Sequence, residues 1–343
     1  MNSLFKETKI KNMELKNRIV MPPMCMYCAE EDGLVTDWHI MHYASRAVGG
    51  TGLIIVEATG ICPEGRISSN DLGLWNDQQI PGMKKLTDAV HANGAKIAVQ
   101  LNHAGRKCTA LGMDVEAPSA VPFDEDSVTP REMTVSDIKE TILQFRQAAE
   151  RAEKAGFDMI EVHAAHGYLL SEFLSPLTNR RTDEYGGSLE NRVRMLGQVL
   201  DAVKEVWPKE KPLCVRVSAE DYQDGGNMAE DLAQMLNMVK DKGIDLVNVS
   251  TGGVVPVAPN AVKGYQIPHA ETIKKATGLP VIAGGLVTDP QEAEDIIFGE
   301  KADFVYIGRE LLRNPYWPLQ AAGELGVDIA WPKQYERAKP RHK

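Results

Sequence analysis

The chain has 343 residues, 43% hydrophobic and 25% charged, which is typical of a globular protein with a buried core. Its net charge of −10, without a long run of Lys or Arg, excludes a surface built to bind nucleic-acid phosphates. Five cysteines are too few for a disulfide scaffold and fit a reducing compartment. The sequence has neither a signal-peptide core nor an apolar run of the ~18 residues that a membrane span needs, so we expect a cytoplasmic protein that binds no membrane.

Eight short β-branched runs recur along the chain, and nearly every one precedes a segment with helical periodicity. The runs are Arg18–Met21, Gly52–Ala58, Lys96–Leu101, Asp158–His163, Leu213–Ser218, Leu246–Ser250, Pro280–Ala283 and Phe304–Ile307. The helical segments are 39–48, 77–93, 136–155, 189–206, 228–242, 267–277, 289–298 and 309–313. Strand and helix in alternation indicate a parallel sheet.

Eight such units predict an α/β fold, a closed (β/α)8 TIM barrel with an N-terminal capping segment and a C-terminal tail. An open doubly wound sheet would use similar units, but no G-x-G-x-x-G follows the first run. No Pro-rich or Ser-rich linker interrupts the chain, so we expect one domain over residues 1–343. The turn-rich stretch from Cys108 to Pro130 follows the third run, where barrels place substrate loops.

Chemically distinctive residues lie where the runs end, which in a TIM barrel is the location of the active site. They are Pro22, Pro23, Met24 and Cys25 after the first run, Ala58 at the end of the second, Gln100 in the third, His163 and His166 at and after the end of the fourth, and Arg216 in the fifth. Glycines follow the last two runs. Gly285, Gly308 and Arg309 suit a phosphate site, where backbone N–H groups and a helix start receive an anion, although glycines after strands also form plain turns.

His163 and His166 admit three interpretations: metal ligands, buried structural histidines, or hydrogen-bond donors to a substrate oxygen. A metal needs a third ligand, and a strand end is not the helix that places two histidines four residues apart on one face, so we expect no metal. Tyr168 adds a potential proton donor two residues on. Cys25 and Cys28 form a C-x-x-C, but zinc would need a second pair, so Cys25 is better explained as a single thiol beside a cofactor.

Long motifs extend over nearly the whole chain, from LKNRIVMPPMCMY through QLNHAGRK, EVHAAHGYLLSEFLSPLTNRRTDEYGGSLENR and IGRELLRNP to QYERA. On these motifs the sequence resembles the Old Yellow Enzyme family, and most closely its bacterial, thermophilic-like subgroup of NADPH dehydrogenases. The resemblance implies an FMN cofactor over the barrel mouth. Its ring would lie beside Pro22, Pro23, Met24, Cys25 and Ala58, its pyrimidine edge at Gln100, its N1 near Arg216, and its phosphate at Gly285, Gly308 and Arg309.

The resemblance also implies the activity of an ene-reductase, which uses NADPH to reduce the C=C bond of small electrophilic alkenes in a ping-pong cycle. His163 and His166 would donate hydrogen bonds to the carbonyl or nitro oxygen, Tyr168 would protonate the α-carbon, and Tyr27 would help bind the substrate oxygen. Two alternatives are an FMN barrel enzyme with a different acceptor and a non-catalytic FMN-binding stress protein. Relatives that oxidise amines or reduce dienoyl-CoA carry an additional iron–sulfur cysteine cluster, which this sequence lacks.

In the same subgroup a C-terminal Arg reaches the active site of the neighbouring subunit, and QYER places Arg337 at that position. The resemblance therefore implies a homodimer or homotetramer. A solvated tail residue is the simpler interpretation of Arg337, and the chain continues as AKPRHK without the aromatic end of some relatives. Pro22 also replaces a Ser common in the family, which removes one possible hydroxyl contact with the flavin.

Overall fold

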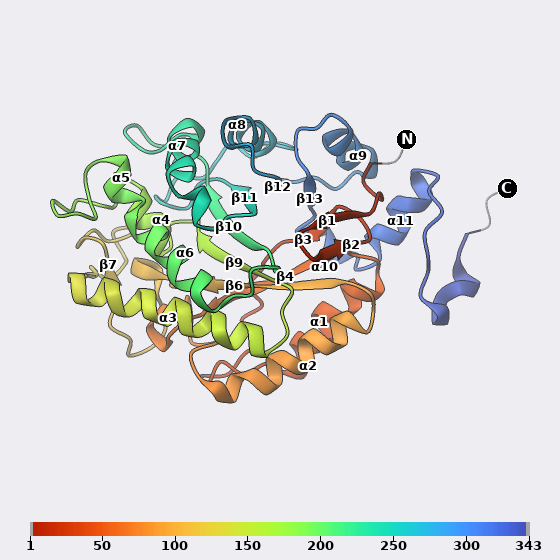
Figure 1. Cartoon of the computed structure of the whole chain (residues 1–343), viewed down its shortest axis with the longest axis horizontal. Coiled ribbons are helices and arrows are strands. Elements are labelled where there is room, and N and C mark those ends of the chain that lie inside the picture. Colours follow the sequence, from red (N-terminus) through yellow and green to blue (C-terminus); the bar gives the residue numbers. More distant parts are fainter. Residues whose placement is uncertain (1–2, 341–343) are drawn as a thin grey trace.

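The computed structural model describes residues 3–340. Its centre is a closed parallel barrel in which each strand pairs with the next along the ring (Figure 1). The ring closes because β3 pairs with β13 on one side and with β4 on the other. The strands are β3 Ile19–Met21, β4 Leu53–Gly60, β6 Lys96–Asn102, β9 Met159–Ala164, β10 Leu213–Ser218, β11 Leu246–Ser250, β12 Val281–Ala283 and β13 Phe304–Tyr306. The predicted TIM barrel is confirmed, and every predicted strand overlaps an observed one.

Helices follow the strands and surround the barrel (Figure 1). The principal helices are α1 Asp37–Val48, α2 Ile80–His91, α3 Val135–Lys154, α6 Arg194–Val206, α7 Ala229–Val239, α8 Ile267–Thr277, α9 Pro290–Phe298 and α10 Arg309–Arg313. The segment predicted as 189–206 is interrupted at Val193, where α5 Leu189–Arg192 ends. Two short helices were not predicted, α4 Leu169–Leu174 and α11 Trp317–Glu324. No helix within residues 3–340 is long and apolar enough to cross a bilayer.

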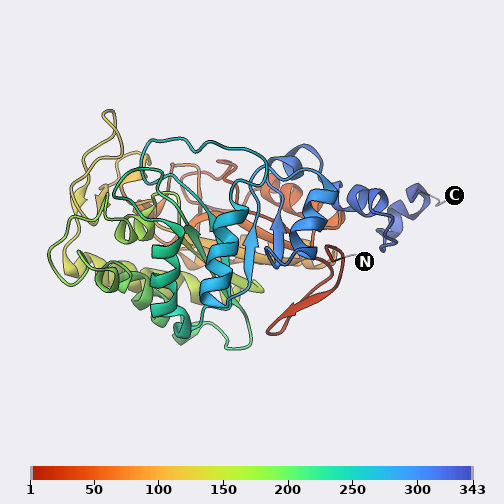
Figure 2. The ribbon, with the colours of Figure 1, turned by 90° about the horizontal axis from the view of Figure 1, so that it is seen from above.

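Short strands and 3-10 turns lie outside the ring of barrel strands. The 3-10 turns are η1 Pro63–Gly65, η2 Asp77–Gln79, η3 Gly105–Lys107, η4 Lys240–Lys242 and η5 Lys333–Ala338. The short strands are β1 Thr8–Ile10 and β2 Met13–Leu15 of the N-terminal hairpin, β5 Leu72–Gly73, and the pair β7 Glu116–Ala117 and β8 Arg131–Glu132. The C-terminal tail, which includes η5, extends away from the barrel (Figures 1 and 2).

The helix α3 illustrates how local sequence forms the outer layer. Thr134 caps its N-terminus, because its hydroxyl accepts a hydrogen bond from the backbone N–H of Asp137 at 3.2 Å while the Asp137 carboxylate accepts one from the backbone N–H of Thr134 at 2.7 Å. The buried positions recur with helical spacing and include Ile138, Phe145 and Ala152. This apolar stripe faces the barrel, and the polar positions face solvent.

The interior of the barrel has two layers, because side chains alternate across a strand with a period of two. The layer near the N-terminal hairpin is apolar and comprises Val20, Leu53, Ile55, Ala98, Met159, Cys214, Leu246, Ile282 and Phe304, with Met13 and Leu15 of the hairpin packed against it. Two residues further along four strands, the interior side chains are polar: Gln100, Glu161, Arg216 and Asn248. The apolar layer thus closes one end, and the polar layer lies toward the C-terminal ends of the strands.

Candidate active site

A cavity of about 410 Å³ opens at the C-terminal ends of β3, β10, β11, β12 and β13. Seven of the ten residues predicted to bind the cofactor line it: Pro22, Pro23, Met24, Arg216, Gly285, Gly308 and Arg309. Two more lie on neighbouring strands, where Ala58 of β4 is paired in register with Gln100 of β6. The fold therefore brings together residues from opposite ends of the sequence around one end of the barrel.

Two glycine loops, after β12 and β13, line this cavity. Gly285 has φ +98°, which L side chains rarely adopt, and a Cβ built there would lie 2.9 Å from the ring of Tyr265. A Cβ at Gly308 would lie 3.8 Å from its nearest neighbours, Met24 and Pro22, which is ordinary van der Waals contact, so this position is not crowded. Arg309 begins α10 directly afterward. Backbone N–H groups without covering side chains, next to a guanidinium, can hold a phosphate.

Arg216 supplies a buried cation with unused hydrogen-bonding capacity. It is 7% exposed, and its Nε atom has no hydrogen-bond partner among residues 3–340. A buried guanidinium N–H without a partner is costly, so this atom points to a missing acceptor in the cavity. The heterocyclic nitrogens and carbonyls of a flavin would provide one. The cavity thus fits the predicted FMN by its donors, its cation and the two glycine turns that line it.

Cys25 and Tyr27 follow in the loop after β3, beyond Met24, which lines the cavity; neither of them is among the lining residues. Glu57 anchors this loop to β4, because its carboxylate accepts a hydrogen bond from the backbone N–H of Met26 at 2.7 Å. It also accepts one from the Tyr43 hydroxyl at 3.0 Å. Burial raises the pKa of Glu57 to about 7. Tyr27 adopts φ +53°, a strained backbone for a tyrosine, and its side chain is 51% exposed. Burial raises the pKa of the Cys25 thiol, which therefore stays protonated at neutral pH.

His163, His166 and Tyr168 form a compact group of rings at the end of β9. The ring centroid of His163 lies 5.2 Å from that of His166 and 5.1 Å from that of Tyr168, and the last two are 6.5 Å apart. The turn that carries them is tight, since His166 has φ +61° and Gly167 has φ +68°. The three side chains predicted to act on one substrate therefore lie side by side.

The hydrogen bonds of His163 determine which of its ring nitrogens carries the proton. Burial lowers its pKa well below the usual value, and His166 and Arg216 lower it further, so the ring is neutral. Its Nδ1 accepts a hydrogen bond from the backbone N–H of Ala165 at 3.2 Å, which leaves the proton on Nε2. Within residues 3–340 the only hydrogen bond of the His163 ring is this one at Nδ1, so Nε2 donates to no other residue described. His163 is thus a neutral donor available to a ligand.

His166 and Tyr168 complete the polar group. Burial also lowers the pKa of His166, and its Nε2 lies 2.8 Å from the Ser250 hydroxyl. Burial raises the pKa of Tyr168 above its usual value, so the phenol keeps its proton. The Lys107 ammonium lies 5.2 Å from the centroid of the Tyr168 ring and donates hydrogen bonds to the backbone oxygens of His166 at 3.0 Å and Gly253 at 3.2 Å. It ties the histidine turn to the loop after β11.

Several residues of the site were not predicted. Ser250, Gln266 and Tyr306 line the cavity, and the amide N–H of Gln266 donates to the hydroxyls of Ser250 at 3.1 Å and Thr251 at 3.0 Å. The Tyr306 hydroxyl donates to the side-chain oxygen of Gln266. One signal was available: Tyr306 is a phenol in an otherwise apolar strand. Arg337, by contrast, was predicted, and it lies on the tail away from the barrel.

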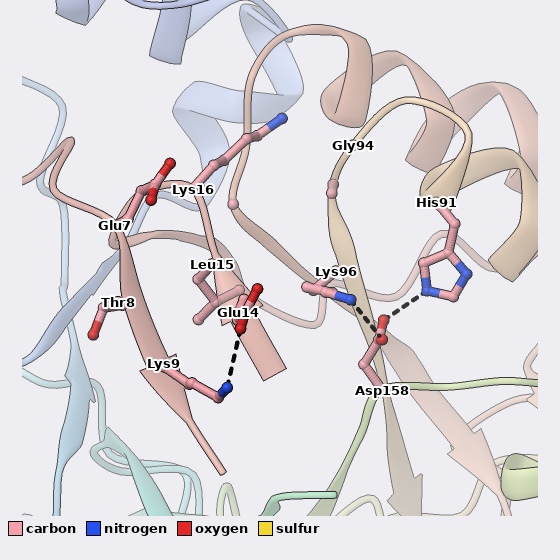
Figure 3. A pocket seen from close by; sticks show the side chains of 12 residues that line it. Glu7, Thr8, Lys9, Glu14, Leu15, Lys16, His91, Gly94, Lys96 and Asp158 are labelled. Atoms are coloured by element: carbon pink, nitrogen blue, oxygen red, sulfur yellow. Dashed lines mark hydrogen bonds and ion pairs between the residues drawn. The ribbon is translucent and has the colours of Figure 1, made fainter. Parts of the chain in front are cut away.

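A second cavity, of about 670 Å³, lies at the opposite end of the barrel, between the N-terminal hairpin and the starts of β6 and β9 (Figure 3). Its charged groups are largely paired with one another. Lys9 pairs with Glu14 at 3.0 Å, while Asp158 pairs with His91 at 2.7 Å and with Lys96 at 3.3 Å (Figure 3). Paired charges at the N-terminal end of barrel strands are typical of a stabilising role.

Known proteins share this architecture. Residues 3–327 match the model of the NADH:flavin oxidoreductase / NADH oxidase family. The chain is 54% identical to an NADPH dehydrogenase of Geobacillus thermodenitrificans, over 97% of this chain and 98% of the relative. It is similar to the structure of morphinone reductase, with a TM-score of 0.82 and 31% identity, over 97% of this chain and 92% of that one.

A 2-naphthoyl-CoA reductase structure gives a TM-score of 0.89 at 30% identity over 95% of this chain, but the match spans only 52% of that longer protein. The family and the name of the relative agree with the predicted FMN cofactor and NADPH reductant. The chain therefore belongs to the NADH:flavin oxidoreductase / NADH oxidase family, as its Old Yellow Enzyme motifs predicted, and is a flavin-dependent oxidoreductase.

Proposed function

We propose that this protein is an ene-reductase that reduces the C=C bond of α,β-unsaturated carbonyl or nitro compounds at the expense of NADPH. The observation that carries the proposal is the free Nε2 proton of the neutral His163, next to a protonated Tyr168. Reduction of an activated alkene needs a hydrogen-bond donor to the carbonyl or nitro oxygen and an acid that protonates the α-carbon. A protein that only stores FMN needs no such acid, which argues against the non-catalytic alternative.

We further propose that FMN occupies the cavity at the ends of β12 and β13. Gly285, Gly308 and Arg309 would hold its phosphate, Gln100 its pyrimidine edge, and Arg216 the region where negative charge accumulates on reduction. Pro22, Pro23, Met24, Cys25 and Ala58 would line its ring. When bound, FMN supplies the hydride acceptor for NADPH and then the hydride donor for the alkene.

The residues around the substrate have separate roles in this proposal. His163 donates a hydrogen bond to the substrate oxygen from Nε2, and His166 donates one from Nδ1, the ring nitrogen that Ser250 does not engage. These bonds draw electrons from the double bond and make its β-carbon electrophilic. Tyr27 contributes to binding the same oxygen. Tyr168 gives its phenolic proton to the α-carbon and regains one from solvent. Because burial keeps both histidines neutral, the oxygen is stabilised by donors and not by an imidazolium ion.

Isotope labelling tests this assignment directly. With NADPH carrying deuterium at the transferred position and 2-cyclohexenone as substrate, the deuterium should appear at the β-carbon of the product. A proton from solvent should appear at the α-carbon, and parallel double-reciprocal plots would support the ping-pong order. Deuterium at the α-carbon, or no saturated ketone at all, would contradict the proposal.

We also propose a homodimer or homotetramer in which Arg337 enters the active site of a neighbour. An apolar surface beside the site supports self-association: Trp38 is 50% exposed, Met41 61% and Leu312 36%, and they border a hollow of about 420 Å³. The tail that bears Arg337 extends beyond the barrel (Figure 2). Sedimentation of Met41→Glu tests the surface. This variant should dissociate, and an unchanged oligomer would exclude the surface as the interface.

A further inference from the structure

Glu161 is a carboxylate inside the barrel for which the proposed mechanism has no use. It lies on β9, is 0% exposed, and is paired in register with Gln100 on one side and with Cys214 on the other. A charged side chain in the middle of a parallel barrel is costly unless it is fully compensated. Its neighbours therefore indicate what it does.

The first neighbour is Gln100, the residue proposed to contact the pyrimidine edge of the flavin. The Nε2 atom of Gln100 donates a hydrogen bond to Oε1 of Glu161 at 2.8 Å. A carboxylate can only accept, so this contact fixes the amide with its nitrogen toward Glu161. The carbonyl oxygen of Gln100 is then left as an acceptor for the ligand, and the opposite orientation of the amide is excluded.

The other carboxylate oxygen is equally engaged. Nδ2 of Asn248 donates to Oε2 of Glu161 at 2.8 Å, and the Cys214 thiol lies 3.6 Å from the same oxygen. Each oxygen thus accepts a hydrogen bond from an amide, the arrangement expected of an ionised carboxylate. Burial raises the pKa of Glu161, and Arg216 together with the donors Asn248, Gln100 and Cys214 opposes this rise by stabilising the anion. Asn248 is in turn paired in register with Arg216 of β10, so the anion and the buried guanidinium belong to one polar layer.

We propose that Glu161 is a positioning residue that fixes the acceptor orientation of Gln100 and offsets the charge of Arg216, thereby setting how strongly the site prefers reduced over oxidised FMN. This inference rests on the proposed flavin site. Reduced flavin carries more negative charge than the oxidised form, so a net positive site favours it. With Glu161 ionised, Arg216 is partly neutralised and the preference is moderate.

The decisive substitution is Glu161→Gln, which keeps the volume and removes the charge. We expect the dissociation constant of oxidised FMN to increase several-fold, because the amide of Gln100 is no longer held in one orientation. We also expect the reduced form to be favoured at least tenfold more than in the wild type, which is an increase in midpoint potential of about 30 mV for a two-electron couple. Titration of apoprotein with FMN and a spectroelectrochemical titration measure the two quantities.

A rescue variant separates charge from packing. The variant combines Glu161→Gln with Asn248→Asp. The new amide at position 161 then donates a hydrogen bond to the new carboxylate at position 248, and the negative charge returns beside Arg216. The midpoint potential should return toward the wild-type value. If Glu161→Gln alone does not fold, this double variant compared with Asn248→Asp alone still tests the role of the charge.

Glu294→Gln is the matched control. Glu294 is a buried carboxylate that accepts two hydrogen bonds, from the backbone N–H groups of Ser3 at 2.7 Å and Leu4 at 2.8 Å, and it does not line the flavin cavity. This variant should lose stability without any change in potential. Equal potentials for wild type and Glu161→Gln, with FMN bound by both, would overturn the inference. Failure of the wild type itself to bind FMN would instead refute the proposed function.

Discussion

Replacing His163 by Asn removes one catalytic hydrogen bond and leaves its surroundings intact. The Oδ1 atom of Asn occupies nearly the position of Nδ1 in His, so it can still accept the hydrogen bond from the backbone N–H of Ala165, which is 3.2 Å from Nδ1. Asn has no counterpart of the Nε2–H group. The turn should therefore persist while the donor to the substrate oxygen disappears.

The expected loss follows from the charge that develops on the substrate oxygen during hydride transfer. Removing one preorganised donor at such a position costs about 10²–10³ in rate, or about 2.7–4 kcal/mol. The reaction of NADPH with the flavin develops no anion on a substrate oxygen. Flavin reduction by NADPH should consequently slow far less than flavin reoxidation by an enone.

Anaerobic stopped-flow measurement of the two half-reactions checks this prediction. His103→Asn is the matched control, because Nδ1 of His103 accepts a hydrogen bond from the backbone N–H of Gly105 at 3.1 Å in the same way, while its Nε2 is buried away from ligand. That variant should reoxidise at nearly the wild-type rate. If His163→Asn reoxidised with cyclohexenone within about threefold of the wild type, the assignment of the oxygen donor would be wrong.

Three further predictions follow. Tyr168→Phe should lower the rate of enone reduction by about 10²–10⁴ because the proton donor is lost, with FMN affinity unchanged, and a normal steady-state rate would exclude Tyr168 as the acid. Arg337→Ala should lower kcat/KM for the enone about tenfold, as expected for loss of one charged contact, with the sedimentation coefficient unchanged, and an unaltered kcat/KM would mean that the tail enters no neighbouring site. Burial lowers the pKa of His103 to about 4. Between about pH 6.5 and about pH 4 only the unfolded chain therefore takes up this proton, and the wild type loses stability as the pH falls through this interval. The destabilisation caused by His103→Asn in urea should therefore be about 2 kcal/mol smaller at pH 5 than at pH 7, and equal values would contradict the buried neutral ring.

The barrel could be predicted because its strands are buried on both sides and appear in the sequence as uninterrupted apolar runs. The predicted run Leu213–Ser218 coincides with β10, and the predicted helix 267–277 coincides with α8. The helix α4 escaped prediction because all of its residues, Leu169–Leu174, are buried, so no polar face marks a helical period. The N-terminal hairpin was expected only as a capping segment, since its strands have three residues each.

The residues of the candidate site also fall into two groups, those that the sequence predicts and those that it does not. Residues at strand ends, such as His163 and Arg216, could be predicted because barrel topology brings all strand ends together. Gln266 could not, since it reaches the cavity through the long connection after β11, whose path depends on tertiary packing. Glu161 could have been singled out as a carboxylate within an apolar strand, but its partners Gln100 and Asn248 lie on other strands, and only the register of the barrel brings them together.

The central claim is that this flavoprotein takes electrons from NADPH and passes them to an activated alkene. The most direct test is the visible spectrum of the purified protein under anaerobic conditions, first with NADPH and then with 2-cyclohexenone. We predict that NADPH bleaches the flavin band at about 450 nm and that the enone restores it. A protein that NADPH bleaches but the enone does not reoxidise would contradict the ene-reductase assignment, and a protein without a flavin band even after incubation with FMN would contradict the cofactor site itself.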